Sequence, residues 1–290
     1  MSLPLRSLTA SLGALTLGAH MAQAEMTPLG DNVYMHFSNY YSSLVVIGDN
    51  GVLVVDPAWT DRAKTMQAEI AGITDKPVTH VVLTHEHYDH VGGTEVFEDA
   101  QIVCHATCQK FFDLDVLGGA PDTVNQSFED ELTIDLGGKQ VELLHMGSGD
   151  GVATTIVSVP ADKVVATADM YDADSLTDSM WLEDRNYLGM RKILNELASW
   201  DLNHSVSGHS ASTDVAALRD HAAFLNDLYD AVKTELDAAM AEGGPQAAFA
   251  LLGGDLPGQI DLPAYKDWNG YDEHLSTHAW RMGMSIMHGG

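Results

Sequence analysis

The chain has 290 residues, of which 45% are hydrophobic and 19% are charged, so it is long enough for one large globular domain or two small ones. Its formal net charge is −28 at pH 7, from 42 acidic and 14 basic residues. Nothing in this composition indicates disorder, and the acidity argues against binding to a nucleic-acid backbone, which requires clustered Lys and Arg.

The first 24 residues have the pattern of a secretory signal peptide. Arg6 supplies a positive start, residues 8–17 form a short apolar core, and Ala22-Gln23-Ala24 resembles a small-x-small cleavage site. We therefore expect cleavage after Ala24 and a periplasmic or secreted protein. The apolar core is too short and too rich in Ser, Thr and Gly to span a bilayer, so we expect no membrane span after processing.

Residues 33 to 83 are predicted to contain four strands and one helix. The apolar runs at 33–37, 43–47 and 52–55 are separated by Gly, Asn and Asp turn residues, which is typical of neighbouring strands. Residues 60–72 have helical spacing, and 79–83 form the next strand.

A dense group of potential metal ligands follows this last strand directly: His85, His87, Asp89 and His90. Side chains repeat every second residue in extended chain, so His85 and His87 point to the same side and can bind one ion. Asp89 and His90 lie where the chain must turn, so they can bind a second ion or orient a bound water. Surface turns seldom concentrate His and Asp in this way, and we therefore predict a metal site.

The remaining sequence predicts strands followed by helices. Gly92 and Gly93 are expected to open a helix through Phe97, and residues 114–125 to form a loop. Strands are predicted near 102–103, 132–134, 141–144, 154–159, 164–167 and 205–206, with helices at 184–200 and 214–242. Gly243-Gly244-Pro245 should end the last helix. We predict a single domain over residues 25–290, in which about 214–290 form a C-terminal helical cap.

The two cysteines, Cys104 and Cys108, are four residues apart. Export would permit a disulfide, but this spacing on a helix seldom gives the required geometry. We therefore expect both to be small packing residues.

The run His-x-His-x-Asp-His resembles the signature of the metallo-β-lactamase-fold hydrolases, a family that includes lactonases, glyoxalase II, RNA-processing nucleases, alkylsulfatases and β-lactamases. The resemblance implies an α/β fold, a four-layer αβ/βα sandwich with a one- or two-metal site along one edge. It also implies that Asp56, which ends a buried strand, supports the metal ligands without binding metal. The acidic charge makes the nuclease branch a poor match.

Later segments match the family's remaining ligand positions in order and spacing. Thr167-Ala168-Asp169 matches the bridging carboxylate, and Ser207-Gly208-His209 matches the last imidazole. Where relatives have a His in Gly-x-x-His-Thr, however, this chain has Asp150. We expect Asp150 to replace that ligand; the alternatives are His145, five positions earlier, and a lost ligand.

The resemblance then implies two metal sites. His85, His87 and Asp150 would form site one, while Asp89, His90 and His209 would form site two, with Asp169 between them. Three carboxylates and a bridging hydroxide would balance two divalent ions completely, leaving less positive charge to polarise a substrate. Hard ions such as Mn, Fe or Mg then suit site one better, while four imidazoles keep zinc as the default.

We therefore expect a hydrolase that uses metal-bound hydroxide on an ester, lactone or similar small-molecule bond, with Asp89 as the catalytic residue that holds the nucleophile. A β-lactamase fits less well, because relatives with that activity usually replace the Asp169 equivalent by Cys or Ser. The alternatives are an iron-dependent sulfur dioxygenase-like oxidoreductase and a metal-binding protein with degenerate catalysis. The sequence indicates no oligomeric state.

Overall fold

A computed structural model describes residues 25–182 and 185–289. The expected signal peptide at 1–24 lies outside the described residues, as does Asp184, with which the predicted helix 184–200 began. No helix in the described part of the chain combines the length and apolar character that crossing a membrane requires.

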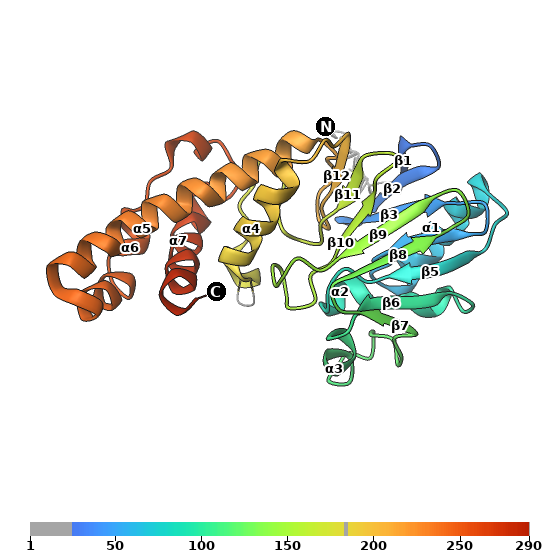
Figure 1. Cartoon of the computed structure of the whole chain (residues 1–290), viewed down its shortest axis with the longest axis horizontal. Coiled ribbons are helices and arrows are strands. Elements are labelled where there is room, and N and C mark those ends of the chain that lie inside the picture. The colour runs from blue at the N-terminus through green and yellow to red at the C-terminus, as the bar shows by residue number, and fades with distance from the viewer. Residues whose placement is uncertain (1–24, 183–184, 290) are drawn as a thin grey trace, which may run out of the picture.

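Two sheets share a hydrophobic core and lie on the right of Figure 1. The first has seven strands in chain order: β1 Glu25–Gly30, β2 Val33–Ser38, β3 Tyr41–Ile47, β4 Val52–Val55, β5 Val78–Val82, β6 Gln101–His105 and β7 Gln126–Phe128. The second has the order β12-β11-β10-β9-β8, with β8 Glu131–Asp135, β9 Gln140–Leu144, β10 Ile156–Val159, β11 Val164–Ala166 and β12 His204–Val206. Strands β4 to β7 pair in parallel, as do β11 and β12.

Alternating side chains build a hydrophobic layer between the sheets. In β3, Leu44 and Val46 belong to this inner layer, while Val45 points to the opposite face. The second sheet contributes Val157 and Ala166 to the same inner cluster.

Helices cover the two outer faces. On the first sheet, Ala63 and Met66 of α1 (Thr60–Ile73) pack in one cluster with Val45, and α3 (Cys108–Phe112) joins this cluster. On the second sheet, Ile156 packs in one cluster with residues of α4 (Tyr187–Ala198) and α5 (Val215–Leu252). The order helix, sheet, sheet, helix confirms the predicted four-layer αβ/βα sandwich.

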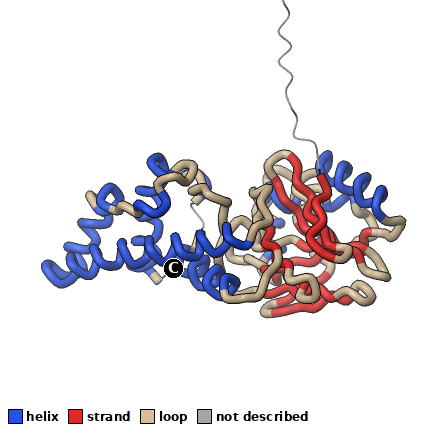
Figure 2. Tube along the Cα trace, turned by 90° about the horizontal axis from the view of Figure 1, so that it is seen from above, coloured by secondary structure: helices blue, strands red, loops and turns tan. Residues whose placement is uncertain are grey.

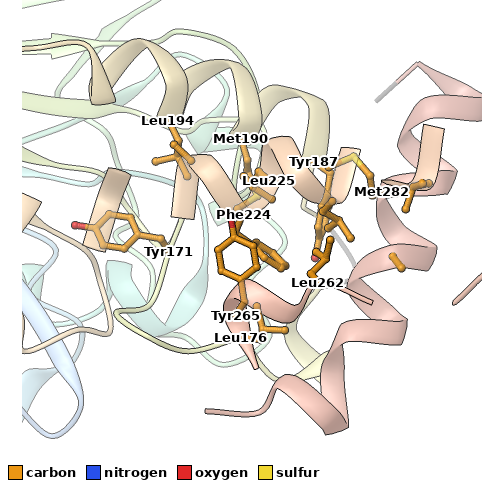
Figure 3. Close-up of a cluster of buried hydrophobic side chains, with 14 of the residues drawn as sticks. Tyr171, Leu176, Tyr187, Met190, Leu194, Phe224, Leu225, Leu262, Tyr265 and Met282 are labelled. Atoms are coloured by element: carbon orange, nitrogen blue, oxygen red, sulfur yellow. The ribbon is translucent and has the colours of Figure 1, made fainter. Parts of the chain in front are cut away.

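The C-terminal quarter of the chain is a helical extension that packs on α4. It consists of α5, α6 (Leu256–Gln259), a 3₁₀ turn (Pro263–Tyr265) and α7 (Tyr271–His288). Figures 1 and 2 show these helices extending to one side of the sheets. The sequence predicted a helical cap for this segment. Aromatic and aliphatic side chains from α4, α5 and α7 form a single buried cluster, part of which Figure 3 shows.

Glycines decide two of the predicted helix boundaries, of which one is confirmed and one is wrong. Gly243-Gly244-Pro245 interrupts the long helix as predicted: Gly244 has a non-helical φ of 69° and ψ of −164°, and a second helical segment continues α5 across this kink to Leu252. Gly92-Gly93 does not open a regular helix: the short α2 (Tyr88–Val91) ends at Gly92, and Gly93, with a φ of 78°, starts a 3₁₀ turn at Thr94–Val96. Strands β1 and β7 were not predicted.

The expectation for the cysteines is also corrected, because Cys104 and Cys108 form a disulfide with a Cα–Cα distance of 6.2 Å. The argument against a disulfide assumed that both lie on one helix. Instead Cys104 belongs to β6 and Cys108 begins α3 after a turn, so the chain folds back between them. Both are fully buried, as expected of packing residues.

Candidate metal centre

Strand ends bring all seven predicted ligands to one edge of the sandwich. The run from His85 to His90 follows β5, Asp150 lies in the loop between β9 and β10, Asp169 follows β11, and His209 follows β12. Loops at the ends of strands are where α/β folds commonly place their ligands. The predicted ligand atoms gather in two overlapping groups that share Asp169: His85, His87, Asp150 and Asp169, and Asp89, His90, Asp169 and His209. A third possible group joins Asp56 with His85 and His90.

In the first group, Asp150 faces both histidines of the motif. Its Oδ2 atom is 3.7 Å from His85 Nε2 and 3.7 Å from His87 Nδ1. Asp169 Oδ2 is 3.8 Å from the same His85 nitrogen. These separations exceed hydrogen-bonding distance but suit donor atoms that surround a common ion.

The second group is more compact. Asp169 Oδ2 is 2.9 Å from His90 Nε2 and 2.9 Å from His209 Nε2, and these two nitrogens are 3.3 Å apart. Asp89 Oδ2 is 3.5 Å from His90 Nε2 and 3.7 Å from His209 Nε2. Asp169 therefore belongs to both groups of donor atoms, and its role as a bridging ligand stays a prediction.

The donor set fits divalent cations. His85 Nε2 and Asp169 Oδ1 are buried, yet neither has a hydrogen-bond partner among the described residues. Buried polar atoms are normally paired, so orphaned atoms on two members of one cluster of imidazoles and carboxylates indicate a cation site. Imidazole and carboxylate donors suit zinc, manganese and iron. Metal binding by each individual residue stays a prediction.

The electrostatics of the group agree with this interpretation. Burial holds the pKa of His85 well below its usual value, so its imidazole is neutral, as a metal ligand must be. Burial alone would lower the pKa of His90, but the nearby carboxylates of Asp169 and Asp56 raise it well above its usual value. Burial alone would raise the pKa of Asp169, but His90 and His209 lower it well below its usual value. The carboxylate thus attracts positive charge, which a metal ion can supply in place of protons.

Buried partners orient the ligands from behind. Thr84 donates its backbone N–H to Asp56 Oδ1 at 2.8 Å and its hydroxyl to Asp56 Oδ2 at 2.6 Å, so the same hydroxyl accepts from His85 Nδ1 at 2.8 Å. His209 Nδ1 donates to the Tyr40 carbonyl at 3.0 Å. With both Nδ1 atoms protonated, the Nε2 lone pairs face the site. The supporting role that the resemblance implied for Asp56 agrees with these contacts.

Glu86 and Tyr41 support the site from positions for which we had made no prediction. The Glu86 carboxylate accepts from the backbone N–H groups of Val152 (2.8 Å) and Ala153 (3.0 Å), which ties the Asp150 loop to the histidine motif. The Tyr41 hydroxyl donates to Asp89 Oδ2 at 3.0 Å.

Sequence reasoning also missed Arg185. Its Nε donates to Asp150 Oδ1 at 2.8 Å, and both side chains are buried. Arg185 lies outside every recognised motif and 35 positions from Asp150, so no sequence signal connects the two residues.

The alternative ligand His145 has other partners. Its Nδ1 bonds the Thr154 carbonyl at 2.9 Å, and its ring stacks on His105 with centroids 4.0 Å apart. His145 is in none of the three possible ligand groups formed by the described residues. The geometry therefore favours Asp150 as the residue in the third ligand position.

Comparisons with known proteins agree with the fold and the motif. Residues 38–175 match the model of the Metallo-beta-lactamase superfamily. The chain is 29% identical over 147 residues to the 2,4-dinitroanisole O-demethylase subunit alpha of Nocardioides sp. (strain JS1661), covering 49% of this chain and 44% of that protein. It is 26% identical over 156 residues to the Metallo-beta-lactamase type 2 of Bacillus cereus (49% and 58%). The 2,4-dinitroanisole O-demethylase subunit beta of the same Nocardioides strain is 25% identical over 218 residues (72% and 65%).

These alignments span roughly half to two thirds of the curated relatives. Among solved structures, a metallo-beta-lactamase from Pontibacter korlensis superimposes with a TM-score of 0.61 at 20% identity, covering 70% of this chain and 99% of that one. A second from Erythrobacter litoralis gives 0.59 at 17% identity (71% and 97%). At these identities the structural matches establish the fold.

Proposed function

Residues 38–175 of this chain belong to the metallo-beta-lactamase superfamily, and from this premise we propose that the protein is a binuclear metal-dependent hydrolase of small ester or lactone substrates. The observation that carries the proposal is the convergence of four imidazoles and three carboxylates in two groups that share Asp169. When bound, two divalent ions, with zinc as the default, supply Lewis acidity for attack on a carbonyl-like centre.

We assign the proton transfer to Asp89. Its side chain is half exposed, so a substrate can reach it, and its Oδ2 lies within 3.7 Å of His90 Nε2 and His209 Nε2. A carboxylate in this position can accept the proton of an attacking water and pass it to the leaving atom. Tyr41 holds that oxygen by its hydrogen bond. No serine or cysteine nucleophile is required.

Features of the rim support a small organic substrate. The Tyr40 ring is 62% exposed and stacks on His209 with centroids 5.1 Å apart, and Val152, two residues after Asp150, is 40% exposed. Both offer apolar contact beside the ligands. Retention of Asp169 supports the general hydrolase branch over a β-lactamase.

Cleavage of an aryl methyl ether is a second candidate. It is favoured by the similarity to both subunits of the 2,4-dinitroanisole O-demethylase, of which the alpha subunit is 29% and the beta subunit 25% identical in the aligned regions. Iron-dependent sulfur oxidation stays a further hypothesis, because His85, His87 and Asp150 resemble a two-His-one-carboxylate set. We also propose export, on the basis of the sequence pattern of residues 1–24.

The proposal is tested by reconstituting the protein with Zn, Mn or Fe(II) and assaying an ester, lactone, aryl methyl ether, phosphodiester and sulfate panel. Oxygen uptake with thiols is recorded in parallel. We expect metal-dependent hydrolysis of an ester or lactone, loss of at least about 100-fold in Asp89→Asn, and no change in Asp99→Asn, an exposed carboxylate outside both ligand groups.

Oxygen consumption without hydrolysis would support the oxidoreductase and overturn the proposal. Ether cleavage without ester or lactone hydrolysis would establish the second candidate. A protein that binds metal and turns over nothing would be the degenerate member that the sequence left open.

A further inference from the structure

Arg185 is a buried cation at the edge of the metal centre, where relatives with a third histidine would need no counter-charge. We propose that Arg185 is a positioning residue that orients the Asp150 carboxylate toward the first metal ion and offsets the negative charge that this aspartate adds. The inference rests on the proposed metal centre, but its test does not depend on any hydrolytic activity.

The side-chain geometry divides the two oxygens of Asp150 between two tasks. Oδ1 accepts the charge-assisted hydrogen bond from Arg185 Nε at 2.8 Å. Oδ2 faces His85 and His87 at 3.7 Å each. Because Arg185 holds one oxygen, the carboxylate cannot rotate freely and the other oxygen stays directed at the imidazoles.

The backbone fixes this pair as well. Asp150 and Arg185 form an isolated antiparallel bridge, and Asn186 donates its backbone N–H to the Gly149 carbonyl at 2.8 Å. The Asn186 side chain then caps α4 by accepting from Gly189 N at 2.7 Å. A Cβ on Gly189 would overlap the Ser148 carbonyl oxygen, so the start of α4 and the Asp150 loop are in direct contact.

The ion pair between Arg185 and Asp150 changes the net charge around the predicted metal ions. Asp89, Asp150 and Asp169 bring three negative charges to the two groups. The Arg185 guanidinium supplies one positive charge beside them, because arginine is not deprotonated in proteins. Three carboxylates and one guanidinium carry the same charge as two carboxylates. The complete neutralisation expected from the sequence therefore does not hold once Arg185 is counted.

A purely structural role is the competing explanation, because Arg185 also donates from a terminal guanidinium nitrogen to Thr177 Oγ1 at 2.9 Å. That bond would help to hold the segment between Asp169 and α4 whether or not residue 150 is an aspartate. The two explanations separate in a background where the third ligand is changed.

The experiment is a double-mutant cycle on metal affinity. Zn²⁺ dissociation constants are measured by competition with a chromophoric chelator for the wild type, Arg185→Met, Asp150→His and the double variant, and the visible spectra of the Co²⁺ forms are compared. We expect Arg185→Met to weaken the first ion by at least about 10-fold in the wild type. In the Asp150→His background the same change should alter affinity by less than about 2-fold or tighten it, because a cation beside an imidazole ligand only repels the ion.

The control is Arg191→Met, which removes one arginine from α4 that stacks on Tyr229 at 4.2 Å and lies outside the ligand groups. It should leave both Zn²⁺ affinity and the Co²⁺ spectrum unchanged. If Arg185→Met does not fold, the cycle is run with Arg185→Lys, which keeps the charge but loses the planar fork and should give a smaller loss with the same background dependence.

An equal loss in both backgrounds would overturn the proposal in favour of a structural role through Thr177. Tighter binding in Arg185→Met alone would overturn it too, because Arg185 would then compete with the ion for Asp150. If the cycle behaves as expected and the substrate panel stays negative, the proposed hydrolase function fails while this inference stands.

Discussion

Three of the predicted metal ligands are oriented by contacts that lie outside the ligand motifs. Thr84 orients His85, the Tyr40 carbonyl orients His209, and Arg185 orients Asp150. Such partners commonly change metal affinity or activity by about 10- to 100-fold when they are removed. The residues that sequence reasoning did not identify are therefore as testable as those that it did.

Tyr41 offers a residue-scale test of the role of Asp89. Tyr41→Phe removes the hydroxyl that donates to Asp89 Oδ2 at 3.0 Å but keeps the ring, which packs edge-on against Trp59. We expect kcat to fall about 10-fold with unchanged metal content, because the Asp89 carboxylate loses the hydrogen-bond donor that holds its Oδ2 atom in place. An unaltered kcat would contradict the assignment of proton transfer to an Asp89 carboxylate positioned by Tyr41.

The supporting contacts could not be predicted where the two partners lie far apart in the sequence. The run from His85 to His90, Asp169 and His209 could be found because the spacing of a known motif links them. Tyr41 and Asp89 are 48 positions apart, and Asp150 and Arg185 are 35 apart; only the folded chain brings each pair together. The substitution at Asp150 was visible in the sequence, but its compensation was not.

At the scale of elements, the turn after β12 is built around a glycine. A Cβ on Gly208 would overlap Asp169 Oδ1 and lie 3.0 Å from the Cε1 atom of His90, so only glycine leaves room for the shared carboxylate. We expect Gly208→Ala to reduce the retained metal to fewer than one ion per chain after dialysis, measured by elemental analysis.

Gly72→Ala is the matched control. A Cβ at Gly72 meets nothing within 4 Å, and this position lies within the helix α1. Alanine there should keep the full metal content and stabilise the fold by up to about 1 kcal/mol, since alanine is the better helix former. Equal metal loss in both variants would contradict the steric argument for Gly208.

Periodicity predicted the strands and the longer helices well, because alternating or helical apolar spacing reflects burial in a layered core. It failed where the backbone conformation of single residues decides the outcome. Gly93, with a φ of 78°, starts a 3₁₀ turn in place of the predicted regular helix, and Cys104 and Cys108 meet across a turn that was taken for a helix. Sequence spacing alone does not reveal either path of the chain.

At the scale of the whole molecule, buried histidines in the helical extension couple stability to pH. His221 and His278 are each 2% exposed, and the His221 ring stacks on Trp268 with centroids 5.7 Å apart. Burial lowers the pKa of both to about 3. The unfolded chain therefore binds protons below pH 6.5 that the folded chain excludes, so the free energy of unfolding falls as the pH is lowered from 6.5 toward 3.

The test is urea unfolding of the metal-free protein at pH 7.5 and pH 5.5. The wild type should lose about 1 kcal/mol for each such histidine, and His221→Phe should lose about 1 kcal/mol less than the wild type between these pH values. His288→Phe, at an exposed position near the end of α7, serves as the control and should match the wild type. The same pH dependence in His221→Phe would show that His221 is protonated in the folded protein.

The number of metal ions bound per chain should distinguish the wild type, Asp150→His and Asp150→Ala when it is determined by elemental analysis after equilibrium dialysis. In the proposed metal centre, seven residues hold two ions and Asp150 is the third ligand of the first. We predict two ions in the wild type and in Asp150→His, and about one in Asp150→Ala, which keeps the site of Asp89, His90, Asp169 and His209. Two ions retained in Asp150→Ala would contradict the account.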